Sequence, residues 1–241
     1  SETPLCNAGG GGGTVTFLTQ PQSQTVAASG AATFSATVSV PAGAGALDVR
    51  YRVYANELSV RTSHVDASHA HGNGAGLFLY VEGRKGSPQK LRFELPAGWR
   101  TSIALPERDG AFEARDYDEL VDSPFECGTH RTLDFTVRGK PHTVAIWGQG
   151  NEDSVRLVED LARIVEAASQ VFGGELPYER YLFIVHLTAG GGGGLEHRAT
   201  QVDGIAPWRF KPEKSYRGVL ALFSHEFFHA IQFNYDYLED P

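Results

Sequence analysis

Methionine is absent from this 241-residue chain, cysteine occurs only twice, and long apolar runs are missing. The uninterrupted apolar stretches are short, as in residues 219–223, so no segment is expected to span a bilayer as a helix. Lysine and arginine form no run and the net charge is −8, which argues against nucleic acid and anionic membranes as partners. Because the chain begins at Ser1, we expect a processed or trimmed N-terminus.

The composition that is present suits a folded protein. Hydrophobic residues make up 41% of the chain and charged residues 21%, so a core can form and general disorder is not expected. The length allows one large domain or two ordinary ones. Cys6 and Cys127 permit one disulfide, but nothing in the sequence indicates that they meet.

The first part of the chain is predicted to be rich in β-strands. Residues 1–13 read as a glycine-rich linker, and residues 14–140 as a β-rich N-terminal domain. Strands are expected at residues 47–55, 58–65, 76–83, 89–96, 100–106 and 131–139. Their spacing of about ten residues is typical of a β-sandwich or a saddle of antiparallel strands.

The pattern changes in the second part, residues 141–241. Apolar spacing predicts a strand at 142–148, a helix at 152–172, a buried strand at 181–187, an edge strand, and a helix at 215–235 that begins at Ser215. This order of elements predicts an α+β fold.

The last helix carries His225, Glu226 and His229 in the pattern HExxH. Positions i and i+4 of a helix share one face, so the two imidazoles can bind one tetrahedral Zn²⁺. Glu226 is placed to take a proton from a water that the zinc activates. The alternative is a pair of core histidines, but burying such a cluster without partners is costly. We therefore expect zinc binding here.

Three other segments could hold a ligand, but each has a more ordinary interpretation. His64, Asp66, His69 and His71 allow a second metal site, but their spacing matches no standard set, so a loop with solvated or hydrogen-bonded histidines is favoured. The acidic run at residues 116–122 lacks EF-hand spacing and reads as a solvated face or a domain contact. The glycines at 190–194 match no phosphate-binding fingerprint.

Several segments resemble the glycyl aminopeptidase family of zinc metallopeptidases, whose wider relatives, the gluzincins, have a thermolysin-like catalytic fold. The segments are YRVYANELSVRTSHVDASH, ARDYDELVDSP, YLFIVHLTAGGGGGLEHR and ALFSHEFFH. The resemblance implies a β-rich domain followed by the first part of a thermolysin-like domain. It also implies His225 and His229 as zinc ligands, Glu226 as the base, and Glu196 as the residue that binds the free α-amino group of a peptide substrate.

The chain departs from that family at both ends. Residues 14–40 look like the first strands of bacterial immunoglobulin-like repeats, and residues after His229 look more like another group of secreted HExxH peptidases. The third zinc ligand of the family is a Glu on a later helix, so we expect it beyond Pro241, with Glu239 as a weaker candidate. Residues 1–241 alone are accordingly expected to be nearly inactive.

The sequence thus predicts an aminopeptidase-type zinc metallopeptidase that hydrolyses N-terminal peptide bonds. A non-catalytic exported binding module that keeps the fold is the alternative. The resemblance implies a bacterial cell-envelope, periplasmic or secreted protein. The glycines after Cys6 look like a lipoprotein tether, although mature lipoproteins begin at their cysteine.

Overall fold

The computed structural model describes residues 5–9, 16–19, 37–39 and 46–239, and the side chains of 46–232. The chain divides into two compact units, Ser1–Val53 and Tyr54–Pro241. In the first unit, β1 (Leu5–Gly9) pairs antiparallel with β4 (Ala46–Arg50), and β2 (Thr16–Thr19) with β3 (Thr37–Ser39). The immunoglobulin-like stretch expected at residues 14–40 lies largely outside the described residues.

The second unit begins with two small antiparallel sheets. One sheet has the order β5-β6-β11-β8, with the bounds His64–Val65, His69–Gly72, Phe125–Gly128 and Arg100–Ile103. The other has the order β7-β10-β9, with the bounds Gln89–Leu91, Ala111–Ala114 and Glu107–Arg108. The short helices η1 (Gly74–Gly76) and α1 (Tyr117–Val121) complete this part.

A five-stranded mixed sheet follows in the order β12-β13-β14-β16-β15. The strands are β12 (Arg131–Val137), β13 (Lys140–Trp147), β14 (Tyr181–Leu187), β16 (Thr200–Ile205) and β15 (Gly194–Glu196). The three central strands run parallel, and β12 and β15 are antiparallel to their neighbours. The central strand β14 is buried along its whole length, as the apolar run at residues 181–187 predicts.

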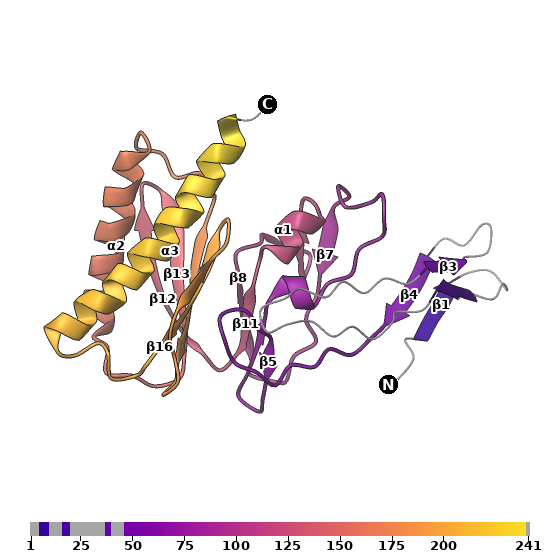
Figure 1. Cartoon of the computed structure of the whole chain (residues 1–241), viewed down its shortest axis with the longest axis horizontal. Coiled ribbons are helices and arrows are strands. Elements are labelled where there is room, and N and C mark those ends of the chain that lie inside the picture. The colour runs from indigo at the N-terminus through magenta and orange to yellow at the C-terminus, as the bar shows by residue number, and fades with distance from the viewer. Residues whose placement is uncertain (1–4, 10–15, 20–36, 40–45, 240–241) are drawn as a thin grey trace. The chain divides into compact units, whose positions relative to one another are not determined.

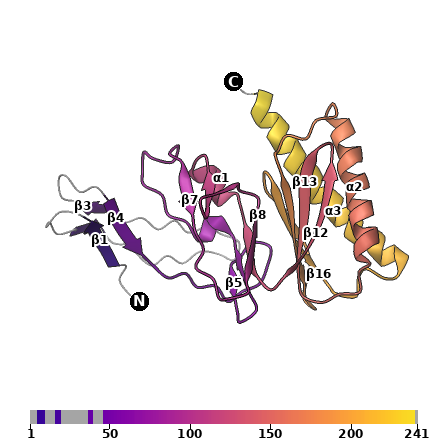
Figure 2. The ribbon, with the colours of Figure 1, turned by 180° about the vertical axis from the view of Figure 1, so that it is seen from behind.

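Two long helices cover the same face of this sheet, as Figures 1 and 2 show from opposite sides. Helix α2 (Ser154–Val171) is capped by Asp153, whose carboxylate accepts from two backbone N–H groups. Helix α3 (Glu213–Glu239) buries Val219, Phe223 and Phe227 against Phe183 and other residues of the main core. The amphipathic periods of the two helices thus explain why they lie against the sheet.

Part of the predicted strand pattern is wrong. Residues 76–83 form no strand: Gly76 ends the short helix η1, the large side chains at 79–81 are exposed, and the Val81 carbonyl accepts from the Arg84 N–H in a turn. The segment at 58–65 is extended only at β5, whereas β6 and β11 were not predicted. Strand β12 pairs with β13 in the five-stranded sheet. The domain boundaries 14–140 and 141–241 stay a prediction.

Two further predictions concern the cysteines and the membrane. Cys127 is a free, fully buried thiol on β11, and burial raises its pKa to about 11. The side chain of Cys6 lies outside the described residues. Within the described part of the chain, no helix is long and apolar enough to cross a membrane.

Candidate metal and peptide site

Helix α3 presents two imidazoles on one side and buries its opposite stripe. His225 is exposed and His229 is partly buried, and their Nε2 atoms lie 3.2 Å apart with the rings nearly perpendicular. Two nitrogens bound at about 2.0 Å to one tetrahedral zinc ion are separated by ~3.3 Å. The pair therefore has the spacing that a single zinc ion needs.

The neighbouring residue on the helix is almost hidden from solvent. The exposed fraction of Glu226 is 5%, and burial, followed by the negative charge of Glu196, raises its pKa from the ordinary value. A Cβ atom on Gly194 would lie 2.3–2.5 Å from the Glu226 side chain. The glycine of β15 therefore leaves the space in which this carboxyl sits.

Strand β15 brings Glu196 to the helix. β15 pairs antiparallel with β16, with Glu196 opposite Gln201, and α3 packs against both strands. The charge of Glu196 reaches Glu226 strongly enough to alter its pKa. The structure thus brings Glu196 close to His225, Glu226 and His229, although Glu196 lies about thirty residues earlier in the sequence.

The segment after Glu196 is held by an acid from the β-rich part. Asp122 accepts hydrogen bonds from His197 Nδ1 at 2.9 Å and from the Arg198 backbone N–H at 2.9 Å. Asp122 thus makes its contact within the second compact unit, and its side chain is also 41% exposed, so whether the acidic run is a solvated face or a domain contact stays a prediction. Burial of His197 against this carboxylate fixes the turn that follows Glu196.

A buried carboxyl lies beneath α3 and was not predicted. Asp203 on β16 accepts from Gln201 Nε2 at 2.8 Å, and Gln201 also donates to the Phe223 carbonyl at 3.4 Å. Burial raises the pKa of Asp203 well above its ordinary value, with a further contribution from the charge of Glu226. No motif marks Asp203, because its position depends on the register of β16.

The described side chains add no third potential metal ligand to His225 and His229. Among residues 46–232, no His, Cys, Asp or Glu completes a close group of three with His225 and His229. Glu239 belongs to the backbone of α3, but its side chain lies outside the described residues. Glu239 therefore remains a candidate on sequence grounds alone.

The central members of the second histidine cluster are buried on a strand, so of the two predicted states, solvated or hydrogen-bonded, the structure shows the hydrogen-bonded one and no loop at these residues. His69 and His71 lie on β6 and are 0% and 1% exposed. His69 Nδ1 donates to Glu126 Oε1 at 2.7 Å, and His186 Nε2 donates to Glu126 Oε2 at 2.9 Å. His71 Nδ1 donates to the Phe125 carbonyl at 3.1 Å.

Charge and burial explain why this cluster holds together. Burial alone would raise the pKa of Glu126, but the hydrogen bonds from His186 and His69 keep it well below its usual range. Burial lowers the pKa of His71 to about 4, so this imidazole is neutral at pH 7. The side chains of the cluster link β6 and β11 of one sheet to β14 of another, a contact that no sequence pattern indicates.

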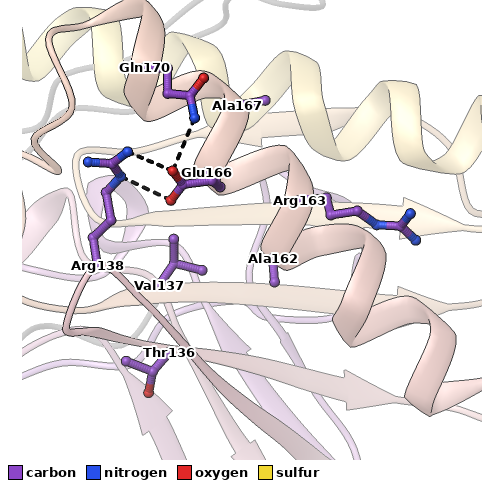
Figure 3. A pocket seen from close by; sticks show the side chains of 8 residues that line it. All are labelled: Thr136, Val137, Arg138, Ala162, Arg163, Glu166, Ala167 and Gln170. Carbon is purple, nitrogen blue, oxygen red and sulfur yellow. Dashed lines mark hydrogen bonds and ion pairs between the residues drawn. The ribbon is translucent and has the colours of Figure 1, made fainter.

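A surface groove of about 470 Å³ between β12 and α2 offers no such chemistry. Figure 3 shows Arg138 crossing it to Glu166, with hydrogen bonds of 2.9 and 2.6 Å. Gln170 adds a bond to the same carboxylate at 3.2 Å. The lining residues include no cysteine or histidine, so we assign this groove a structural role.

Comparison with known proteins supports a peptidase-related family. The Peptidase M61 N-terminal domain matches residues 19–129. The crystal structure of an aminopeptidase N family protein from Idiomarina loihiensis is similar, with 31% identity and a TM-score of 0.70 over 76% of this chain. The similarity covers 34% of that structure, so this chain spans about a third of its length. No match is found among the curated proteins.

Proposed function

We propose that the chain is part of a zinc metallopeptidase of aminopeptidase type, which hydrolyses N-terminal peptide bonds. The observation that carries this proposal is the 3.2 Å approach of His225 Nε2 and His229 Nε2 beside the buried Glu226. The similarity to peptidase families supports it independently. We take the five-stranded sheet with α2 and α3 as the first part of a thermolysin-like, gluzincin catalytic domain.

His225 and His229 fit the zinc ion, which when bound activates water and polarises the scissile carbonyl. Glu226 accepts the proton of the attacking water and passes it to the leaving amine. Burial keeps the carboxylate oriented against Gly194.

Glu196 supplies the preference for an N-terminus. A carboxylate pairs with the positively charged α-amino group of a peptide, and internal peptide bonds carry no such charge. Since Glu196 lies beside Glu226, a bound ammonium group places the first peptide bond near the base. Asp122 positions this carboxylate indirectly, through His197 and Arg198.

The third ligand is proposed to come from outside residues 46–232. Glu239 and an acid following Pro241 are the two sources, and the second agrees better with the family resemblance. With two imidazoles alone, zinc binding is weak and the geometry is loosely fixed. An error of 1 Å in a catalytic site costs about 10²-fold in rate. Residues 1–241 are therefore expected to hydrolyse substrates slowly or not at all.

The experiment compares aminoacyl anilides with their N-acetylated forms, in added zinc, for residues 1–241 and for a chain extended past residue 241. Glu226→Gln should lower kcat/KM by about 10²–10⁴-fold while bound zinc is retained. Glu196→Gln should reduce the preference for a free amino group. Undiminished turnover by Glu226→Gln contradicts the assignment of the base.

Location is proposed from the resemblance alone. We place the protein in the bacterial cell envelope, in the periplasm or outside the cell, where it acts on peptides with free N-termini. Fractionation of the native host followed by immunodetection tests this. Signal in the cytosolic fraction alone contradicts the proposal.

A further inference from the structure

The turn between β5 and β6 brings three potential metal ligands together. One donor atom each from His64, Asp66 and His69 lies within 4.8 Å of the other two. His64 Nε2 and Asp66 Oδ2 are 3.6 Å apart. His69 is fully buried, whereas the carboxylate of Asp66 is 41% exposed, so the group spans from the protein interior to solvent.

The tautomer of His69 is fixed in the way that metal-binding histidines require. Its Nδ1–H donates to the buried carboxylate of Glu126 at 2.7 Å, which leaves a lone pair on Nε2. That Nε2 atom is buried and has no hydrogen-bond partner among the described residues, and the same is true of His64 Nδ1. A carboxylate behind the distal nitrogen orients the ring and increases its basicity as a ligand.

The carboxylate of Asp66 is also oriented in advance. Its Oδ1 atom accepts from the Ser68 backbone N–H at 2.7 Å, the Ser68 hydroxyl at 2.8 Å and the His69 backbone N–H at 3.0 Å. These bonds fix the turn and leave Oδ2 as the oxygen that approaches His64. Trp147 stacks on the His69 ring at 3.7 Å and donates to Ser68 Oγ, and Ser68 in turn donates to Asp66, so Trp147 supports His69 directly and Asp66 through Ser68.

A second set of donor atoms, from His69, Glu126 and His186, is less suitable for an ion. Both oxygens of Glu126 already accept imidazole N–H groups, at 2.7 and 2.9 Å. An ion at that position displaces two buried hydrogen bonds. Glu126 is therefore suited to be the outer carboxylate that orients His69, which leaves the side of His64 and Asp66 for an ion.

We propose that His64, Asp66 and His69 form a second metal site, separate from the HExxH helix, which takes a divalent transition metal ion such as Zn²⁺. Two imidazoles and one carboxylate are a ligand set that zinc, cobalt and nickel accept. The ion ties the β5–β6 turn to the buried cluster that reaches β14 through His186. This proposal does not depend on peptidase activity.

The test measures bound zinc in residues 1–241 by equilibrium dialysis and metal analysis. With zinc at a concentration that saturates the weak two-imidazole site on α3, the parent chain should bind two ions, the double variant His225→Ala, His229→Ala one ion, and Asp66→Asn one ion. Combining all three substitutions should leave none. Asn keeps an oxygen that accepts from Ser68 and removes the ligand charge, so the turn is preserved. Asp109→Asn, at an exposed turn with φ of 51°, is the matched control and should bind two ions.

The outcomes separate the two sites. If the double variant binds no zinc, or if Asp66→Asn in that background still binds one ion, the second site is wrong whatever happens at α3. If only the substitution of Asp66 removes zinc, the HExxH site is wrong and the second site stands. Should Asp66→Asn fail to fold, His64→Gln in the double-variant background replaces it, and zinc must raise its Tm less than it raises that of the double variant alone.

Discussion

The histidines of α3 and those of the buried cluster differ in how their ring nitrogens are used. His225 and His229 lie at the surface with their Nε2 atoms 3.2 Å apart, and no carboxylate bonds to them among the described side chains. His69 and His186 instead donate to opposite oxygens of Glu126 in the interior. The Nε2 atoms of the first pair face each other, whereas the second pair uses one N–H group of each ring to join β6, β11 and β14. The same residue type thus has no carboxylate partner among the described side chains on α3, but links separate strands in the interior.

The largest expected effect is on the buried cluster. Glu126→Ala leaves two buried imidazole N–H groups without an acceptor, so we expect a loss of roughly 3–5 kcal/mol in the free energy of unfolding. Urea unfolding followed by tryptophan fluorescence measures this. Glu113→Ala, which removes a surface ion pair with Lys90, is the control and should change little. If both variants lose the same stability, the cluster has no structural role.

A second prediction uses pH to separate buried from exposed imidazoles. His142 is 1% exposed, and burial lowers its pKa to about 4, against 6.5 in the unfolded chain. The unfolded state therefore binds a proton first, and stability is lost as pH falls from 6.5 towards 4, by roughly 3 kcal/mol for this residue. His142→Gln should flatten that part of the stability profile. If the free energy of unfolding of this variant depends on pH between 6.5 and 4 as it does in the parent chain, the loss of stability in acid does not come from His142.

Whether a cluster could be predicted depends on how far apart its residues lie in the sequence. His225 and His229 are one helical turn apart, so spacing alone predicts that these two share a face and that Glu226 points in a neighbouring direction. Glu126 meets His186 only because two sheets pack together, and short strands such as β6 carry too few residues for a clear alternation. The predicted strand at 76–83 failed for the related reason that β-propensity does not supply a pairing partner.

A smaller effect is expected at Gly194, which sharpens the account of Glu226. Gly194→Ala places a Cβ atom 2.3–2.5 Å from the Glu226 side chain, so the carboxyl must move, at a cost of about 1–2 kcal/mol. Gly190→Ala is the matched control, because nothing lies within 4 Å of its Cβ position. The cost should disappear when Gly194→Ala is made together with Glu226→Ala. A cost that persists in the double variant shows that Glu226 is not what the glycine accommodates.

The smallest expected effect concerns the hydrogen bonds by which Asp122 holds the segment after Glu196. Asp122→Ala removes the acceptor of two hydrogen bonds near the surface, for which we expect a loss of about 1 kcal/mol. Hydrogen exchange of the Arg198 amide should accelerate, because its N–H loses its acceptor. Asp118→Ala, in the same acidic run but exposed, should leave that amide unchanged. Equal exchange in the two variants contradicts a positioning role for Asp122.

The most direct test of the zinc proposal is a titration of the imidazole ¹⁵N resonances with Zn²⁺ in the Asp66→Asn chain. The Nε2 signals of His225 and His229 should shift together, with one apparent Kd, and saturate at one ion per chain. Glu226→Gln should leave this titration unchanged, because the base is not a ligand. If the two signals shift at different zinc concentrations, or neither shifts while zinc binds elsewhere, the pair on α3 does not form a shared metal site.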